Sequence, residues 1–466
     1  MTPKSAYATA LALCLSGCAT LSSQALHNDA TEPAAPWQAP LPDQTRGAAL
    51  QAWWQAQNEP ELTDLIAAAQ KVSPDIASAQ VRIAQAQAQQ AQAWASDLPQ
   101  INATASTTRT YSPAQTPAVA QRQAGLQISW AVDLASFQGA GHVSAAAQLE
   151  AAQALWHDAR TLVAAEVADQ YHSVRTCRHQ LRLLEADASS REQSRVMTEQ
   201  ATRFGRRSQI DLASAQSLAS DSRANVLQQQ ATCEASVKAL VALTGLPEPD
   251  LRTRLASAQS RVPSPTPFAI TAVPAQALMQ RPDVYVAERD VLQAQAKRLQ
   301  TQAARLPRLS LDGFVGRARV QSGSTDVSGP SWTFGPMALT LPLFDAGLRS
   351  AQQHTADVEL EAAQIRFQSK VRQAVREVEE ALLQLHSAEQ RWQEGQLRSQ
   401  RAHTQLDANA RLLEQGMLSQ IDFEDIRRQT WSADRIALAL NLERHRAWLT
   451  LYRAVGGGFT ANHPAE

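Results

Sequence analysis

An internal duplication limits the possible folds of this chain more than any other feature of its sequence. Leu98-Pro99 recurs as Leu306-Pro307, at an offset of 208 residues. Further along, Gly205-x-x-Ser208 recurs as Gly416-x-x-Ser419, at an offset of 211 residues. Because each offset is held over a long span, the sequence predicts two copies of one structural unit.

Each copy is predicted to contain long helices. The expected ranges are about 61–95, 143–203 and 209–244 in the first copy, and about 275–304, 349–414 and 420–455 in the second. A helix of ~60 residues is ~90 Å long, so these helices must pack side by side along a rod or tube. An isolated amphipathic helix is the alternative, but it has no partner of similar length to cover its apolar stripe. The spacing of apolar residues in the second copy follows the heptad of coiled-coil packing, in Val371, Val375, Val378, Leu382 and Leu385.

Four segments have the alternating pattern of β-strands, at 101–110, 124–132, 308–317 and 331–344. Each has ~10 residues or slightly more, the length of a tilted strand that crosses a membrane. The joining segments 112–122 and 318–331 are rich in Ser, Gly, Pro, Thr and Gln, and are predicted to be exposed loops. Four strands cannot close a barrel, and an open sheet edge in lipid leaves backbone groups unpaired. Several copies of the chain are therefore expected to pool their strands.

The N-terminus has the features of an export signal. Lys4 precedes an apolar stretch, 6–15, that is too short to span a bilayer. The stretch ends in Leu15-Ser16-Gly17-Cys18, which resembles a bacterial lipobox, in which the Cys is lipidated and becomes the mature N-terminus. The alternative is an ordinary secretory signal that contains a Cys by chance. No later segment has 18 or more unbroken apolar residues, so no transmembrane helix is expected.

Two cysteines remain after the signal, Cys177 and Cys233. They lie at equal distances in sequence from Gly205, so a helical hairpin that turns there brings them level on antiparallel helices. An oxidising compartment would favour a disulfide between them. The alternative is two unpaired buried thiols, because hairpin registry does not guarantee the required Cβ geometry.

Several classes of function are disfavoured by the composition and motifs. Lys plus Arg (43) nearly equals Asp plus Glu (44), so the chain lacks the basic excess that a nucleic-acid partner requires. Catalytic motifs such as His-Glu-x-x-His and Gly-x-Ser-x-Gly do not occur, and we expect neither an enzyme nor a cofactor. The ten His are scattered and predict no metal site; His172 and His179 share a helix face, where a solvated or packing role is expected.

In combination, these features resemble the TolC outer-membrane efflux family, within it the lipoprotein branch that serves resistance–nodulation–division pumps. The resemblance covers nearly the whole mature chain, and its motifs are weak singly but specific together. Besides the lipobox, the duplication and the paired Gly-x-x-Ser turns, they are Arg281-Pro282-Asp283-Val284, Leu341-Pro342-Leu343-Phe344-Asp345-x-Gly347 and Trp53-Trp54 upstream of Glu61-Leu62.

The resemblance implies a mainly α protein with a small β part, assembled as a homotrimer. Three protomers with four strands each form one 12-stranded β-barrel, continued by an α-helical barrel in the periplasm. The implied function is a passive outer-membrane exit duct for small molecules such as drugs, working with a periplasmic adaptor and an inner-membrane transporter. A duct for type I polypeptide secretion and a lipid-anchored structural coiled coil are the alternatives.

The domain organisation expected from this resemblance begins with a signal peptide (1–17) and a lipidated N-terminal tail with an equatorial segment (18–58). The first repeat (59–255) and the second repeat (274–456) are joined by a linker (256–273) and followed by a C-terminal tail (457–466).

The resemblance also implies two functional sites. The hairpin turns match the tips that contact the adaptor, with a turn that has no partner as the alternative; their residues are Gly205, Arg206, Arg207, Ser208, Gly416, Met417, Leu418 and Ser419. Asp422 and Asp425 match an acidic ring at the periplasmic gate. Asp211 is the first-copy counterpart of Asp422, but Ser214 stands in place of Asp425, which favours the second copy as the gate. The alternative is that these Asp residues only stabilise the first turn of the following helix.

Overall fold

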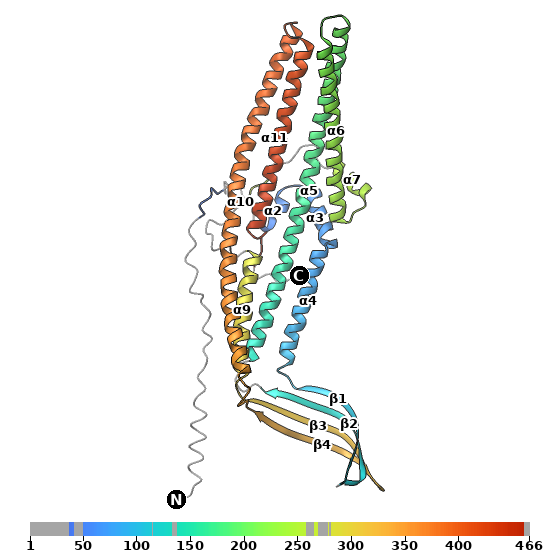
Figure 1. Ribbon diagram of the computed structural model, residues 1–466, viewed down its shortest axis with the longest axis vertical. Helices are drawn as coiled ribbons and strands as arrows, with labels where there is room; N and C mark the ends of the chain where they lie inside the picture. The colour runs from blue at the N-terminus through green and yellow to red at the C-terminus, as the bar shows by residue number, and fades with distance from the viewer. Residues whose placement is uncertain are drawn as a thin grey trace.

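The computed structural model describes residues 37–41, 50–113, 115–132, 138–257, 265–268, 278 and 281–460. Within this part, a small antiparallel sheet lies at one end of a tall helical body, and two hairpin turns lie at the other end (Figure 1). The expected signal peptide and lipid-attachment residue, Cys18, lie outside the described residues.

Two helical hairpins form the tall body. Helices α5 (Gln138–Arg203) and α10 (Leu348–Glu414) run from the sheet to the far end, ~100 Å away at 1.5 Å per residue. Helices α6 (Gln209–Thr244) and α11 (Gln420–Ala454) return from the two turns. These bounds confirm the expected long helices to within a few residues.

The returning helices stop halfway, and a second pair of helices covers the lower half of the body. Helix α4 (Pro74–Ala95) packs on α5 below the end of α6, and α9 (Pro282–Ala303) packs between α5 and α10 below the end of α11 (Figure 1). The second junction is closed by the Arg281 guanidinium, which donates a 2.7 Å hydrogen bond to the carbonyl of Ala454. Arg281 also pairs with Asp283 at 2.8 Å and with Glu377 at 2.6 Å, which explains the Arg-Pro-Asp-Val motif in structural terms.

The expected helical stretch 61–95 is confirmed, but the structure divides it into two helices, α3 (Pro60–Val72) and α4. The break falls at Ser73, whose backbone is extended (ψ 124°) and whose hydroxyl accepts a hydrogen bond from the Ile76 N–H. Pro74 causes this break, since a proline lacks an N–H and disfavours the helical conformation in the residue before it. Three shorter helices complete the described part: η1 (Leu50–Ala52), α2 (Trp53–Ala56) and α7 (Glu248–Ser257).

The sheet has the order β1-β2-β3-β4 and is antiparallel throughout. Its strands are β1 (Gln100–Ser112), β2 (Gln115–Val132), β3 (Arg308–Ser322) and β4 (Thr325–Thr340). The predicted loops 112–122 and 318–331 are therefore wrong: the strands continue through these segments to tight turns. Their polar residues resemble a loop in composition, but they pair across strands, as Arg319 does with Asp326 at 2.8 Å.

One face of the sheet carries large exposed apolar side chains. Leu126, Ile128 and Trp130 alternate along β2, and Trp332 and Phe334 on β4 are also exposed. The register places Val315 opposite both Leu126 and Trp332, so these side chains share one face. Monomeric soluble proteins rarely expose an apolar surface of this kind.

The main hydrophobic core lies at the level where the helix pairs change over. Trp53 is buried there, stacked on Tyr452 with ring centroids 4.7 Å apart, and its indole N–H donates to the Thr266 carbonyl at 2.8 Å. The predicted heptad contributes Val378, Leu382 and Leu385, all buried. The coiled-coil interpretation of α10 is thus confirmed, and the N-terminal segment is fixed to the middle of the body.

Candidate docking and gate sites at the hairpin turns

The two hairpin turns have the same backbone structure. Gly205 and Gly416 adopt left-handed conformations with φ of 70° and 71°. In each turn the N–H of the residue after glycine, Arg206 or Met417, donates to a helix carbonyl five residues earlier, at 2.8 and 2.9 Å. Only glycine takes this conformation without steric cost, and the arrangement is the Schellman ending of a helix. The repeated Gly in the sequence thus marks two equivalent turns at the free end of the body.

Serine begins the helix after each turn. The Ser208 hydroxyl accepts a hydrogen bond from the Asp211 N–H at 3.1 Å, and the Ser419 hydroxyl accepts one from the Asp422 N–H at 3.2 Å. In return, the Asp211 carboxylate accepts from the Ser208 N–H at 3.0 Å, which completes a capping box. These bonds from the Ser208 backbone and hydroxyl hold the pKa of Asp211 below its ordinary value.

The candidate gate residues therefore have different local roles. Asp211 completes the cap of its helix, as the alternative interpretation expected, and is half-buried. Asp422 is exposed and donates its backbone N–H to the capping Ser419. Asp425 makes no cap; its carboxylate pairs with Arg428, one turn further along α11. The contact of Asp422 with Ser419 does not exclude a place in an acidic ring, because Asp422 is exposed.

A buried polar cluster behind Asp425 joins the two hairpins. Glu424 is only 1% exposed, and its carboxylate accepts a 2.5 Å hydrogen bond from the Ser190 hydroxyl on α5. The same Ser190 oxygen accepts a 2.7 Å hydrogen bond from Arg428. Arg427 pairs with Glu424 at 2.8 Å. The relay Arg428–Ser190–Glu424 is thus a polar link between α5 and α11 near the turns.

Sequence reasoning missed Ser190, Glu424 and Arg428. A signal was present, because the first-copy counterparts of Glu424 and Arg428 at the 211-residue offset are Ala213 and Ser217. Charged residues that appear in only one of two equivalent helices indicate a role that the other helix does not share.

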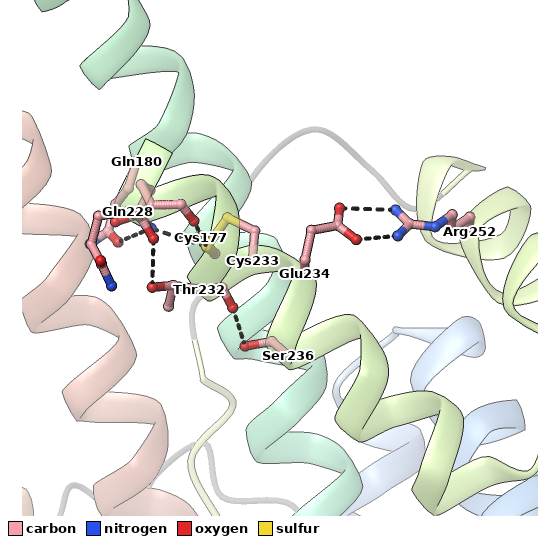
Figure 2. Close-up of a disulfide and its surroundings, with 9 residues drawn as sticks. Cys177, Gln180, Gln228, Thr232, Cys233, Glu234, Ser236 and Arg252 are labelled. Atoms are coloured by element: carbon pink, nitrogen blue, oxygen red, sulfur yellow. Dashed lines mark hydrogen bonds and ion pairs between the residues drawn. A yellow bond between two sulfur atoms is a disulfide. The ribbon is translucent and has the colours of Figure 1, made fainter. Parts of the chain in front are cut away.

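The first hairpin contains a disulfide between Cys177 and Cys233, with the Cα atoms 5.5 Å apart. Figure 2 shows it between α5 and α6, with the Glu234 carboxylate on α6 facing the Arg252 guanidinium of α7. At the equivalent positions the second hairpin has Ala388 and Arg444. The two hairpins therefore share a turn but differ in their cross-links.

No helix of the described residues is long and apolar enough to span a bilayer. Likewise, the described part of the chain contains no group of three or more His, Cys, Asp or Glu residues arranged to hold a metal ion.

Comparison with known proteins gives the same result for both halves of the chain. The outer membrane efflux protein family matches residues 65–246 and 273–457, once in each half. The pyoverdine export outer membrane protein OpmQ of Pseudomonas putida is 27% identical over 93% of this chain and 94% of its own. The probable outer membrane lipoprotein SilC of Salmonella typhimurium is 24% identical over 86% of this chain and 87% of its own.

A similar structure has been solved for the open state of the MtrE outer membrane channel of Neisseria gonorrhoeae. It superposes with a TM-score of 0.76 at 23% identity, over 92% of this chain and 98% of that one. The predicted TolC-like fold is confirmed by this likeness.

Proposed function

Because the chain belongs to the outer membrane efflux protein family, we propose that it is the exit duct of a tripartite efflux pump. Its location is the outer membrane, as for the family. In this proposal the duct is passive and performs no chemistry on its cargo. An inner-membrane transporter of the resistance–nodulation–division class supplies the energy, and a periplasmic adaptor joins the two.

The observation that carries the proposal is the four-stranded sheet with two free edges, β1 and β4, and one exposed apolar face. Within a bilayer, unpaired edge groups cost several kcal/mol each, so a stable sheet must close on itself. Closed single-chain barrels need at least ~8 strands. Three protomers that pair β1 of one copy with β4 of the next supply 12 strands, and the family resemblance supports that number.

The tall hairpins support the second part of the proposal. In three copies, α5 and α10 would continue the wall of the barrel for ~100 Å into the periplasm, with α6 and α11 beside their upper halves and α4 and α9 beside their lower halves. The turns, farthest from the sheet, would meet the adaptor, with Asp422 and Asp425 at the entrance. A lipid on Cys18 would add a second membrane attachment.

The proposed cargo is small molecules, including drugs. Siderophores belong among the candidates, because the relative OpmQ is named for pyoverdine export.

Two measurements test this function. Deletion of the gene should increase susceptibility to dyes, detergents, antibiotics or metals, or should trap a siderophore inside the cell. The purified protein should migrate as a heat-modifiable trimer and conduct ions in planar bilayers. A coiled-coil spacer would show neither conductance nor a heat-modifiable trimer, and a polypeptide duct would show conductance with a secretion defect instead of increased susceptibility.

A further inference from the structure

The two hairpin turns have the same backbone but opposite electrical character. Residues 203–208 of the first turn are Arg-Phe-Gly-Arg-Arg-Ser, with three positive charges. Residues 414–419 of the second turn are Glu-Gln-Gly-Met-Leu-Ser, with one negative charge. The duplication therefore preserved the fold of the turn while its charge diverged from +3 to −1.

Of the three positive charges at the first turn, one is paired within the protomer. Arg203 pairs with Glu199 at 2.6 Å. Arg206 and Arg207 are exposed, and their guanidinium groups make no hydrogen bond or ion pair with any described residue. Phe204, beside them, is 80% exposed. The tip of the first hairpin thus presents two free guanidinium groups and an aromatic ring to the solvent.

The second turn presents an apolar surface at the same positions. Met417, the counterpart of Arg206, is 65% exposed, and Leu418, the counterpart of Arg207, is half-buried. In the trimer of the proposed function, six turns form a ring in which cationic and apolar tips alternate.

We propose that the α5–α6 turn docks onto an acidic segment of the adaptor through Arg206 and Arg207, whereas the α10–α11 turn docks onto an apolar segment. This inference rests on the proposed function and specifies its partner. An adaptor that fits the ring must make a polar contact with the α5–α6 turn and an apolar contact with the α10–α11 turn. An adaptor without carboxylates opposite the α5–α6 turn would not bind. Charge complementarity of this kind sets specificity and association rate more than final affinity.

Arginine is suited to this contact, because its planar guanidinium binds a carboxylate with two parallel hydrogen bonds. Exposed charges are screened over ~8 Å at physiological ionic strength, so the attraction acts mainly once the tips are near one another. Binding through the first turn should therefore weaken as salt is added, and binding through the second turn should not.

The test uses chromosomal variants in the source organism, with the compounds to which gene deletion gives susceptibility. R206E/R207E should lower the inhibitory concentration of these compounds by about fourfold or more, since like charges then face each other. R206K/R207K keeps the charge but loses the planar guanidinium, and as the matched control it should lie closer to the wild-type value than either charge-removing variant. R206M/R207L copies the second turn onto the same backbone and should give an intermediate value. All variants are checked for heat-modifiable trimers and unchanged conductance.

A photoreactive residue in place of Gln209 then identifies the contact by mass spectrometry of the cross-linked peptide. We expect an adaptor peptide that contains Asp or Glu, and replacement of that acid by Arg should restore efflux in R206E/R207E. If R206E/R207E forms no trimer, R206M/R207L is used for the test instead. The Met-Leu pair that it introduces already occurs in the equivalent α10–α11 turn, which has the same backbone structure.

Normal efflux by both charge-removing variants would overturn the proposal, as would a cross-link to lipid, to peptidoglycan or to an adaptor segment without acids. These outcomes leave the proposed function intact. A deletion strain with unchanged susceptibility and a wild-type protein without conductance would instead contradict the proposed function itself.

Discussion

Arg428 on α11 donates a 2.7 Å hydrogen bond to Ser190 on α5, and so links two helices that belong to different copies of the duplicated unit. Ser190 in turn donates to the buried Glu424 at 2.5 Å. If the hairpins separate, Arg428 and Glu424 both lose the Ser190 hydroxyl that joins them. The packing of α11 against α5 near the turns is therefore stabilised by a polar link between two charged groups that are costly to leave buried without a partner.

Replacing Ser190 with Ala should loosen the tips. The change removes the bridging hydroxyl and leaves Arg428 and Glu424 each short of a hydrogen bond, at a cost of about 1–3 kcal/mol. We expect a higher resting conductance of the purified channel in planar bilayers. Ser220→Ala is the control. Ser220 accepts a hydrogen bond from Arg223 on the exposed surface of α6, so this bond does not join two helices. Equal conductance of the two variants would show that the link does not hold the tips together.

Replacing Asp422 and Asp425 with Ala should raise the resting conductance by a different route. Asp425→Ala releases Arg428 from its ion pair, and Asp422→Ala removes the carboxylate beside the capping Ser419. Asp211→Ala is the matched control, because Asp211 is the first-copy counterpart of Asp422 and also donates its N–H to the capping serine, but has no counterpart of Asp425 beside it. If Asp211→Ala changes conductance as much as the double variant does, the effect comes from the ends of the helices and not from an acidic ring.

Replacing Cys177 and Cys233 with Ser should destabilise the first hairpin. The bond closes a loop with a sequence separation of 56, for which chain entropy predicts about 4 kcal/mol. We expect faster hydrogen exchange in α5 and α6 around these positions, with α10 and α11 unchanged. Alkylation of the purified wild type without reductant should label neither thiol; labelling of both would show that the pair is reduced in the cell.

The stability of the body should fall on acidification. His172 is buried and stacked on His445, with ring centroids 4.1 Å apart, and burial together with the charges of His445 and Arg175 lowers its pKa well below 6.5. The folded protein therefore keeps His172 neutral, whereas the unfolded chain binds a proton as the pH falls through about 6.5. Stability conferred by the neutral ring is complete above that pH and is lost below it, by up to ~1.4 kcal/mol per pH unit until the folded pKa is reached.

Thermal unfolding at about pH 7.5 and pH 5 measures this effect. His172→Gln should narrow the difference in melting temperature between the two conditions. His403→Gln, at an exposed position beside Asp434, should leave the difference as in the wild type. An unchanged difference in His172→Gln would assign the acid sensitivity to other groups.

Replacing Cys18 with Ser should abolish lipid attachment. A labelled fatty acid fed to the cells should appear in the wild-type band and be missing from the variant. A variant that keeps the label would remove Cys18 from the anchor. A functional channel without the label would show that the strands alone suffice for membrane insertion.

The hairpins were predictable from the sequence because their signals are local. Gly205 and Gly416 end the helices, Ser208 and Ser419 begin the next ones, and the 211-residue offset shows that both turns have one structure. Cys177 and Cys233 could be placed level for the same reason, since in a hairpin the distance in sequence from the turn fixes the height along the helix.

The errors and omissions have physical causes. The polar ends of the strands around Arg319 and Asp326 have a loop-like composition and become strands only through pairing with a neighbour. Pro74 is a sequence signal for the break at Ser73, but the helical pattern of apolar residues continues across it and hides the break. The Ser190–Glu424 contact joins residues 234 positions apart, so it depends on how two long helices are packed against each other, which no local pattern reports.

The exchange of helix partners at mid-height has a mechanical consequence. Only α5 and α10 are continuous from the turns to the sheet, whereas α6 and α11 end where α4 and α9 begin. If the body bends at that level, α5 and α10 must flex. The other four helices end or begin there, so none of their internal hydrogen bonds has to break. Any movement of the turns would therefore be carried to the sheet through α5 and α10.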